Sequence, residues 1–219
     1  MGPNSRRDFT IAIICALPLE ADAVEALFDE TYDRLSRLYG RESGDTNAYV
    51  NGRIGGHNVV LCYMPGTGKS SAASVAARLR ASYTSIQLAL VVGTCGGTPY
   101  GPYSTQIFLG DVIISDAVIE YDFGKQYPGG FHRTTGVSNS LGPPNQEIRS
   151  LLAGLRAKRA LQEFQGEMLQ QLFTIQHSEL QWRRPDFVDD VLFKASYHHR
   201  HYVPPSSPKC RCFNEALKM

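Results

Sequence analysis

The sequence predicts an α/β fold: a three-layer sandwich in which helices flank a central mixed sheet. Three apolar runs lead to this prediction, and each ends in a sharp turn at proline or glycine: residues 9–17, 59–64 and 88–93. Apolar runs without polar alternation are typical of strands buried on both faces. The carboxyl ends of such strands bind ligands, because free backbone N–H groups and the next helix N-terminus meet there. We therefore expect the three turns to line one shared pocket.

Length and charge favour a single domain with a small ligand. The chain has 219 residues, enough for about one domain with a real core. Its 22 Lys and Arg residues nearly balance 21 Asp and Glu residues. A nucleic-acid-binding protein would show an excess of basic residues, so we expect no nucleic-acid partner.

Cysteine usage and hydropathy predict a cytoplasmic protein. Three of the five cysteines lie in or beside apolar runs, as reduced core thiols do: Cys15, Cys62 and Cys95. A pair of arginines before the first apolar run resembles a secretory signal, but Asp8 and Glu20 flank that run where such a signal has neither. No apolar stretch approaches the roughly 20 residues that span a bilayer, so no membrane partner is expected.

The first half of the chain predicts alternating strands and helices after a loose start at residues 1–8. The strand at 9–17 leads through Pro18 into a helix at 19–28. A polar stretch at 29–46 precedes a hairpin of strands 48–54 and 59–64, whose turn contains two glycines. Small residues at 69–82 predict a helix lying close on the sheet, before the strand at 88–93.

The second half is less regular. A loop at 98–108 precedes a predicted buried strand at 112–118, and residues 121–144 form a long excursion broken by Gly and Pro. Apolar spacing from Asn145 predicts a helix or helix pair covering the sheet, interrupted near Gly166. We expect one domain at residues 9–182 and an irregular tail at 183–219.

Two glycine-rich turns and one glutamate are candidate site residues. Gly66 and Gly68 lie in a Gly-Thr-Gly-Lys-Ser sequence that resembles a Walker A loop, but such a loop needs a glycine where Tyr63 stands. The turn is therefore either a close strand-to-helix connection or a pocket wall. Glu20 lies where a strand meets a helix N-terminus. There it either holds a water or is simply a favourable first-turn acid.

The turn at 93–97 offers a hydroxyl and exposed amides to a sugar or heterocycle, and its candidate binding residues are Thr94, Cys95, Gly96 and Gly97. No histidine lies near Cys95 in sequence, which disfavours a nucleophilic role for its thiol. The tail has zinc-type ligands at spacings that do not fit common frameworks: His198, His199, His201, Cys210 and Cys212. We expect no metal and no cofactor.

The chain resembles the purine and uridine phosphorylase superfamily. Four motifs carry the resemblance in order: TIAIICALPLEAD at 10–22, GTGKSSAA at 66–73, GTCGG at 93–97 and LGDVIIS at 109–115. YDFGKQYP at 121–128 is similar to the nucleosidase-like domain at the front of fungal NLR-type proteins. The resemblance implies cleavage of an N-glycosidic bond in a purine nucleoside or nucleotide, by water or phosphate.

In related methylthioadenosine/S-adenosylhomocysteine nucleosidases, the residue matching Glu20 activates the attacking water, and the turn matching 94–97 lines the nucleoside site. Phosphorylases of the superfamily commonly carry an arginine where this chain has Val91. Loss of that bidentate phosphate partner favours water as the nucleophile.

The resemblance also implies features that this sequence lacks. Relatives continue into a Glu-Met-Glu type motif that grips the ribose and an aspartate that protonates the leaving purine, and neither follows residue 155. The fold is therefore expected to be incomplete at its C-terminal end and catalysis impaired, since general-acid help contributes about 10²–10⁴-fold. The alternative is a non-catalytic nucleotide-sensing or oligomerisation module.

Relatives also close the neighbouring subunit's pocket with residues matching 121–132. This segment contains four aromatic residues, more than a solvated loop needs: Tyr121, Phe123, Tyr127 and Phe131. A homo-oligomer built partly from this segment is expected.

Overall fold

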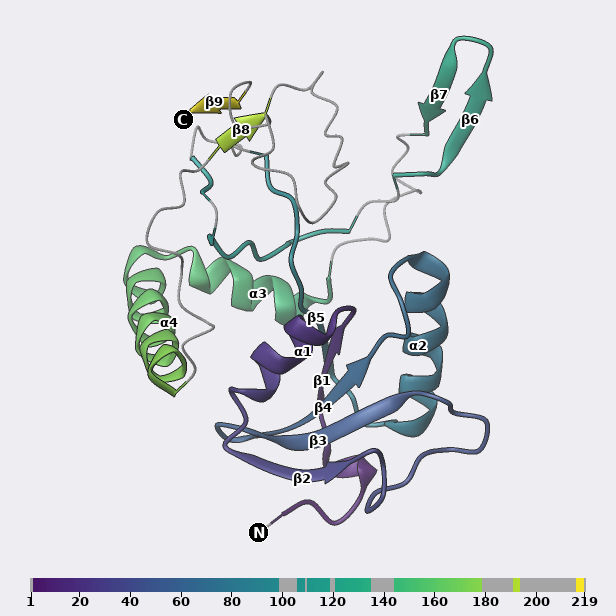
Figure 1. The fold of residues 1–219 in the computed structure, drawn as a ribbon, viewed down its shortest axis with the longest axis vertical. Coiled ribbons are helices and arrows are strands. Elements are labelled where there is room, and N and C mark those ends of the chain that lie inside the picture. The colour runs from purple at the N-terminus through teal and green to yellow at the C-terminus, as the bar shows by residue number, and fades with distance from the viewer. Residues whose placement is uncertain are drawn as a thin grey trace, which may run out of the picture. The chain divides into compact units, whose positions relative to one another are not determined.

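The computed structural model describes residues 2–98, 106–108, 110–118, 121–134, 144–178, 191–193 and 216–218. The chain divides into two compact units, Met1–Gly96 and Gly97–Met219, each with its own helices and strands (Figure 1). None of the helices in the described ranges combines the length and apolarity that a bilayer crossing requires.

The first unit is built on a five-stranded mixed sheet of order β2-β3-β4-β1-β5. Parallel pairing joins β1 (Ile11–Cys15) to β4 (His57–Tyr63) on one side and to β5 (Leu88–Val91) on the other. Antiparallel pairing adds β3 (Ala48–Ile54) and β2 (Glu30–Arg34). The β3–β4 turn contains Gly55 at a φ of 57°, a left-handed conformation that glycine adopts without a steric penalty. The predicted mixed sheet is confirmed.

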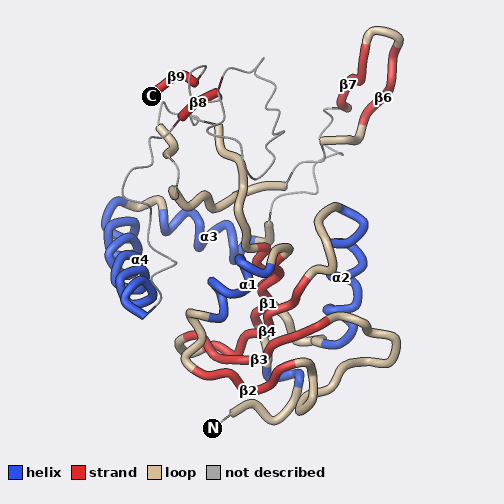
Figure 2. The backbone as a smooth tube through the Cα atoms, in the orientation of Figure 1, coloured by secondary structure: helices blue, strands red, loops and turns tan. Residues whose placement is uncertain are grey.

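Two helices cover opposite faces of this sheet, because alternate strand residues point to opposite sides (Figure 2). One buried cluster joins the sheet to α2 (Lys69–Ser82) and includes Ala12, Ile14, Val60, Cys62, Val75 and Leu79. The other joins the sheet to α1 (Pro18–Glu25) and includes Ile13, Cys15, Val59, Leu61, Ala21 and Val24. The three-layer arrangement predicted from the apolar runs is thus present in this unit.

The start of the chain is ordered from residue 2 onward, and the expected loose start is wrong. A 3₁₀ helix, η1 (Arg6–Asp8), begins after Ser5, whose hydroxyl accepts a hydrogen bond from Arg7 N at 3.2 Å. The Asp8 carboxylate accepts in return from Ser5 N at 2.9 Å. Tyr39 donates its hydroxyl to the Pro3 carbonyl at 3.1 Å. Local capping and this distant contact hold a segment that has few apolar residues.

The polar stretch predicted at 29–46 contains the edge strand β2. Only Asp33 of this strand is buried, so no apolar alternation signals it. The Asp33 carboxylate accepts hydrogen bonds from the backbone N–H groups of Arg37, Leu38 and Tyr39 at 3.0, 3.0 and 3.1 Å. The Asp33 carboxylate therefore closes the following turn, while Tyr32 and Tyr39 pack against the buried cluster on the α2 side of the sheet.

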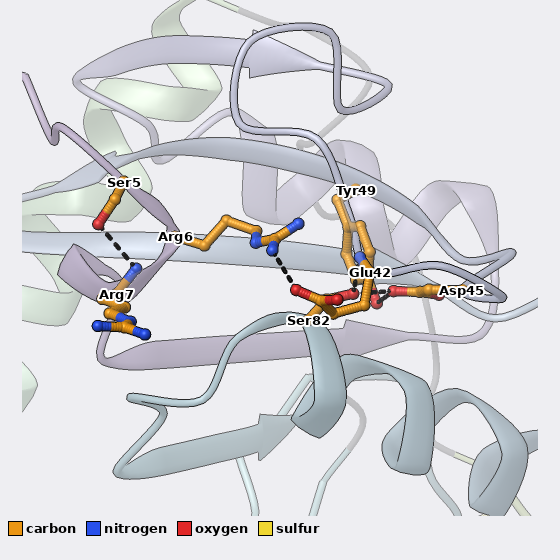
Figure 3. Close-up of polar contacts among 7 residues, drawn as sticks. All are labelled: Ser5, Arg6, Arg7, Glu42, Asp45, Tyr49 and Ser82. Atoms are coloured by element: carbon orange, nitrogen blue, oxygen red, sulfur yellow. Dashed lines mark hydrogen bonds and ion pairs between the residues drawn. The ribbon is translucent and has the colours of Figure 1, made fainter.

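A buried carboxylate also fastens the loop after β2 to α2 (Figure 3). Asp45 accepts hydrogen bonds from the Tyr49 hydroxyl at 2.7 Å and from the Ser82 hydroxyl. Burial alone raises the pKa of Asp45, but the hydrogen bonds from Ser82, Asn47 N–H and Tyr49 outweigh it and lower the pKa. Arg6 pairs with Glu42 of the same loop (Figure 3).

The second unit contains a β-hairpin, two helices and a short strand pair. The hairpin joins β6 (Gly124–Tyr127) to β7 (Gly130–Arg133), and β8 (Val191–Phe193) pairs with β9 (Ala216–Lys218). The helices are α3 (Gln146–Leu155) and α4 (Lys158–Ser178). Asn145 caps α3, because its side-chain oxygen accepts from Ile148 N at 2.9 Å.

Two expectations for this unit need correction. Residues 112–118 do not form a strand, and four of their apolar side chains are exposed: Val112, Ile113, Ile114 and Val118. An apolar run becomes a strand only when a neighbouring strand hydrogen-bonds to it, and none of the strands in the described ranges pairs with this run. The helix break lies at residues 156–157 and not near Gly166. The helix α4 continues through Gly166, since one interior glycine costs only about 1 kcal/mol. The excursion at 121–144 contains the β6–β7 hairpin.

The division into a domain at 9–182 and a tail at 183–219 stays a prediction. Within the tail segment the structure describes β8 and β9, so it is not wholly irregular. Most of the loop expected at 98–108 lies outside the described residues.

Candidate functional site

The turns after β1, β4 and β5 begin at one edge of the first unit's sheet. Parallel register places Cys15 opposite Tyr63 and Ile14 opposite Val91, so the three strands end side by side. Hydrogen bonds from Met64 N to Cys15 O at 2.9 Å and from Val92 N to Ile14 O at 3.0 Å prolong both pairings. This is the edge at which α/β sheets bind ligands.

Glu20 is a buried residue in the first turn of α1, with 9% of its surface exposed. The helix α1 begins at Pro18, and the N–H groups of the residues just before it have no helical partner because they precede its first turn. Glu20 Oε2 accepts hydrogen bonds from Ala16 N at 3.0 Å and from Leu17 N at 2.9 Å. The carboxylate thus folds back over the turn that joins β1 to α1.

The second oxygen of Glu20 is bound by the turn after β5. Glu20 Oε1 accepts hydrogen bonds from Thr94 N at 2.8 Å and from Thr94 Oγ1 at 3.3 Å. Two of the residues predicted for the site, Glu20 and Thr94, are therefore in direct contact although 74 positions separate them.

Gly93 makes this contact possible, and the sequence-based choice of site residues omitted it. A Cβ atom at Gly93 would lie 2.6 Å from Glu20 Oε1, 2.8 Å from Cδ and 2.9 Å from Oε2. Any side chain at this position would therefore displace the carboxylate from its donors. The glycine-rich composition of the turn was the available signal, but it could not distinguish Gly93 from Gly96 and Gly97.

The hydrogen bonds keep Glu20 charged. They hold the pKa of its carboxyl below the ordinary value of 4.5, and the Leu17 N–H contributes most, followed by the Thr94 N–H. Burial acts in the opposite direction but is outweighed. Burial, and then the negative charge of Glu20, raises the pKa of the Cys15 thiol to about 11, so that thiol stays protonated at neutral pH. The site is an anionic carboxylate at the end of a buried strand.

Residues 10–166 of the chain match the Phosphorylase superfamily. The chain belongs to this superfamily. The predicted membership is confirmed.

A similar protein is the nucleotide-binding leucine-rich repeat (NLR)-like protein of Hyaloscypha variabilis, 34% identical over 193 residues. The match covers 85% of this chain but 18% of the relative. The likeness agrees with the predicted resemblance to fungal NLR-type proteins. This superfamily domain therefore spans less than a fifth of that relative's length.

The remaining predicted site residues lie apart from the Glu20–Thr94 contact. Cys95 is a free, exposed thiol, and a Cβ atom at Gly96 would meet open space. Gly97 belongs to the second unit, where a Cβ atom would lie 3.1 Å from Ile113 Cδ1. Gly66 and Gly68 follow β4, and Gly68 takes a φ of 109° before α2. The turn after β4 thus leaves its strand at the same sheet edge as Glu20.

The predicted zinc-type ligands of the tail lie outside the described residues: His198, His199, His201, Cys210 and Cys212. Within the described ranges no group of three or more His, Cys, Asp or Glu side chains is arranged to hold a metal ion.

Proposed function

We propose that this phosphorylase-superfamily domain cleaves the N-glycosidic bond of a purine nucleoside or nucleotide, with water as the favoured nucleophile. The observation that carries the proposal is the Glu20 carboxylate, which is buried and ionised at the carboxyl edge of the parallel strands. Superfamily membership supplies the reaction class.

In the proposed reaction the oxygen of a water forms a bond to the anomeric carbon as that carbon's bond to the purine nitrogen breaks. The electron pair of the broken bond leaves with the base, which takes up a proton from solvent, and Glu20 returns to solvent the proton it receives from the attacking water. The proton released by the water passes to Glu20. The transition state has oxocarbenium character, so a nearby carboxylate also stabilises its positive charge.

The choice of water over phosphate is supported by Val91. This last residue of β5 is 82% exposed and stands where phosphorylases of the superfamily commonly have an arginine. Valine offers no hydrogen-bond donor to a phosphate, whereas a guanidinium binds it through two.

The test is release of free base from a panel of adenine and guanine nucleosides and nucleotides, with and without phosphate, measured by chromatography. We expect slow release that does not need phosphate. Glu20→Gln keeps the side-chain shape but removes the base, and should abolish release. Asp22→Asn removes an exposed charge from the same helix and should leave release unchanged. Release that requires phosphate would overturn the assignment of water.

A second candidate is a non-catalytic nucleotide-sensing or oligomerisation module. It is favoured by the likeness to a protein whose name describes nucleotide binding and leucine-rich repeats. Calorimetric titration separates the two candidates, since a sensing module binds a purine nucleotide and returns it intact. Binding without base release in the assay above would favour the sensing role.

We further propose a cytoplasmic homo-oligomer. The free thiols of Cys15 and Cys62 are buried in the core of the first unit, which suits a reducing compartment. The four aromatic side chains predicted to form the subunit contact are exposed around the β6–β7 hairpin: Tyr121, Phe123, Tyr127 and Phe131. Exposed aromatic clusters of this kind commonly form protein interfaces.

A further inference from the structure

Helix α4 carries an apolar stripe along most of its length. At 3.6 residues per turn, five of its apolar side chains fall within about 80° of the helix circumference, and we call these five the α4 stripe: Leu161, Phe164, Met168, Leu172 and Ile175. The five positions include no charged or polar residue. A stripe of this kind is the face that a helix packs against another element.

The α4 stripe is largely exposed. Four of its members have 36–43% of their surface exposed: Leu161, Phe164, Met168 and Leu172. On one side the apolar surface widens through Leu169 and Phe173, which are 51% and 67% exposed. A continuous apolar surface on a helix indicates a site of protein contact.

The opposite face of α4 is suited to water. Arg159 Nε donates to Glu163 Oε1 at 2.9 Å, and both side chains are exposed. On the same face the Thr174 hydroxyl donates to the Gln170 carbonyl at 3.0 Å. Gly166 also lies on this side, so its missing side chain leaves no gap in the α4 stripe. The helix therefore has one apolar face and one polar face.

The α4 stripe has the same spacing from both ends. Its members follow one another at intervals of three, four, four and three residues, which is symmetric about Met168. When two copies of α4 lie antiparallel, Met168 meets Met168 of the second copy at a two-fold axis. Phe164 then lies opposite Leu172 of the second copy, and Leu161 opposite Ile175 of the second copy. Each member of the stripe thus gains an apolar partner, in the two-fold arrangement that is commonest between identical chains.

A parallel pair of α4 helices fits less well. A parallel coiled coil needs a strict heptad, in which the apolar position after Met168 is residue 171. Gln171 stands there, so a parallel pair would bury a polar amide in the seam and turn Leu172 to its side. Antiparallel pairing also places the positive N-terminus of each helix beside the negative C-terminus of the other.

The exposed apolar area is enough for a specific contact. Six side chains contribute to it, namely four members of the stripe with Leu169 and Phe173. With a full surface of roughly 200 Å² each, of which a little under half is exposed, they would bury about 1,100 Å² over two copies. Specific interfaces exceed about 1,000 Å², so this contact suits a reversible dimer.

We propose that α4 binds α4 of a second copy of this chain, antiparallel and around a two-fold axis at Met168. The contact is separate from the one proposed at the β6–β7 hairpin, because it uses different residues. A chain with two such self-contacts assembles beyond a dimer.

The first test measures the mass of the full chain by sedimentation velocity at tens of micromolar. Met168→Lys sets two like charges against each other at the two-fold axis, and we expect the mass of the assembly to fall by a factor of about two or more. Gln170→Lys adds the same charge to the polar face and should leave the mass unchanged. Circular dichroism checks that both variants fold. An unchanged mass in Met168→Lys, or an equal fall in Gln170→Lys, would overturn the proposal.

The second test uses disulfide cross-linking to read the direction of the helices. Every variant has serine in place of three native cysteines, so that the added thiol is the accessible one: Cys95, Cys210 and Cys212. The two remaining native thiols are buried in the core of the first unit. Under mild oxidation Met168→Cys should form a linked dimer.

Leu161→Cys distinguishes antiparallel from parallel pairing. Alone it should stay unlinked, because two copies of residue 161 would lie about 21 Å apart along antiparallel helices, too far for a disulfide. Mixed with Ile175→Cys it should form a linked heterodimer. A linked Leu161→Cys homodimer without the heterodimer would show a parallel pair and overturn the proposal, as would the absence of any link in all three variants.

The two self-contacts can fail separately. Phe123→Asp acts on the β6–β7 hairpin, so an assembly that this variant reduces and Met168→Lys does not would contradict the α4 contact and leave the hairpin contact standing. Base release enters neither test, so failure of the proposed catalytic function leaves this inference unchanged. A strictly monomeric parent chain would overturn it.

Discussion

Glu20 shows how one residue joins two distant turns. Its carboxylate is surrounded by donors from residues 16, 17 and 94, and the space it occupies exists because position 93 has no side chain. A buried carboxylate that loses such donors costs about 1–3 kcal/mol or more. The site and the stability of this sheet edge therefore depend on the same contacts.

Replacing Gly93 with alanine should lower the stability of the protein. The added Cβ atom pushes the carboxylate tip away from its donors, and we expect a loss of about 1–3 kcal/mol in the free energy of unfolding. Gly66→Ala is the matched control, because a Cβ atom there meets open space, and it should change stability by less than about 0.5 kcal/mol. Urea titration measures the free energy of unfolding of both variants. An equal loss in the two variants would contradict the specific steric role of Gly93.

Acid should weaken the fold through Glu20 and Asp45. Both carboxyls have a lowered pKa in the folded chain, with ordinary values of 4.5 and 3.8. The unfolded chain therefore binds more protons as pH falls through this window, and the stability present above it is lost toward lower pH. The thermal midpoint should fall below about pH 4.5. Glu20→Gln should flatten that fall, and an unchanged slope would rule out a lowered pKa for Glu20.

At the scale of elements, hydrogen bonds from polar side chains hold the loop between β2 and β3 against the end of α2. The loop between β2 and β3 is held by Asp45, which accepts from Tyr49 on β3 and from Ser82 at the end of α2. Glu42 N donates to the same Ser82 hydroxyl at 3.0 Å. One serine thereby connects the helix to two points of the loop.

Ser82→Ala should destabilise the chain by about 1–3 kcal/mol, because the buried Asp45 carboxylate loses a donor and Glu42 N loses its acceptor. Ser74→Ala removes an exposed hydroxyl from the same helix and should be nearly neutral. Thermal unfolding followed by circular dichroism compares them. Indistinguishable midpoints would show that the loop is held by other contacts.

At the scale of the whole molecule, we expect the exposed aromatic residues around the β6–β7 hairpin to form the interface of the proposed homo-oligomer. Phe123 is 52% exposed just before β6, beside three further exposed aromatic residues of the hairpin region. Full burial of such side chains in an interface often contributes 2 kcal/mol or more each.

Phe123→Asp should therefore dissociate the proposed homo-oligomer, as measured by light scattering at tens of micromolar protein. Leu38→Asp introduces the same charge at an exposed apolar residue of the first unit and should leave the assembly intact. A parent chain that is strictly monomeric would exclude the assembly. Dissociation by the Leu38 variant alone would place the interface elsewhere.

The sequence alone was sufficient for much of the first unit. Uninterrupted apolar runs predicted the three parallel strands, although burial on both faces is wrong for β5, an edge strand with three of its four residues exposed. Small residues predicted the helix at 69–82 with the bounds that α2 has. These features could be read locally, because burial on one or two faces leaves a periodic pattern in the chain. The four motifs also sufficed for the superfamily, which the match over residues 10–166 confirms.

Only the tertiary structure decided which residues meet. Strand order, with β1 between β4 and β5, brings Thr94 to Glu20 and makes Gly93 the support of the carboxylate. It also decided that the polar β2 pairs at an edge, while the apolar run at 112–118 stays without a strand partner in the described sheets. Hydrogen-bond partners far apart in sequence leave no local pattern, because their meeting depends on how distant strands align.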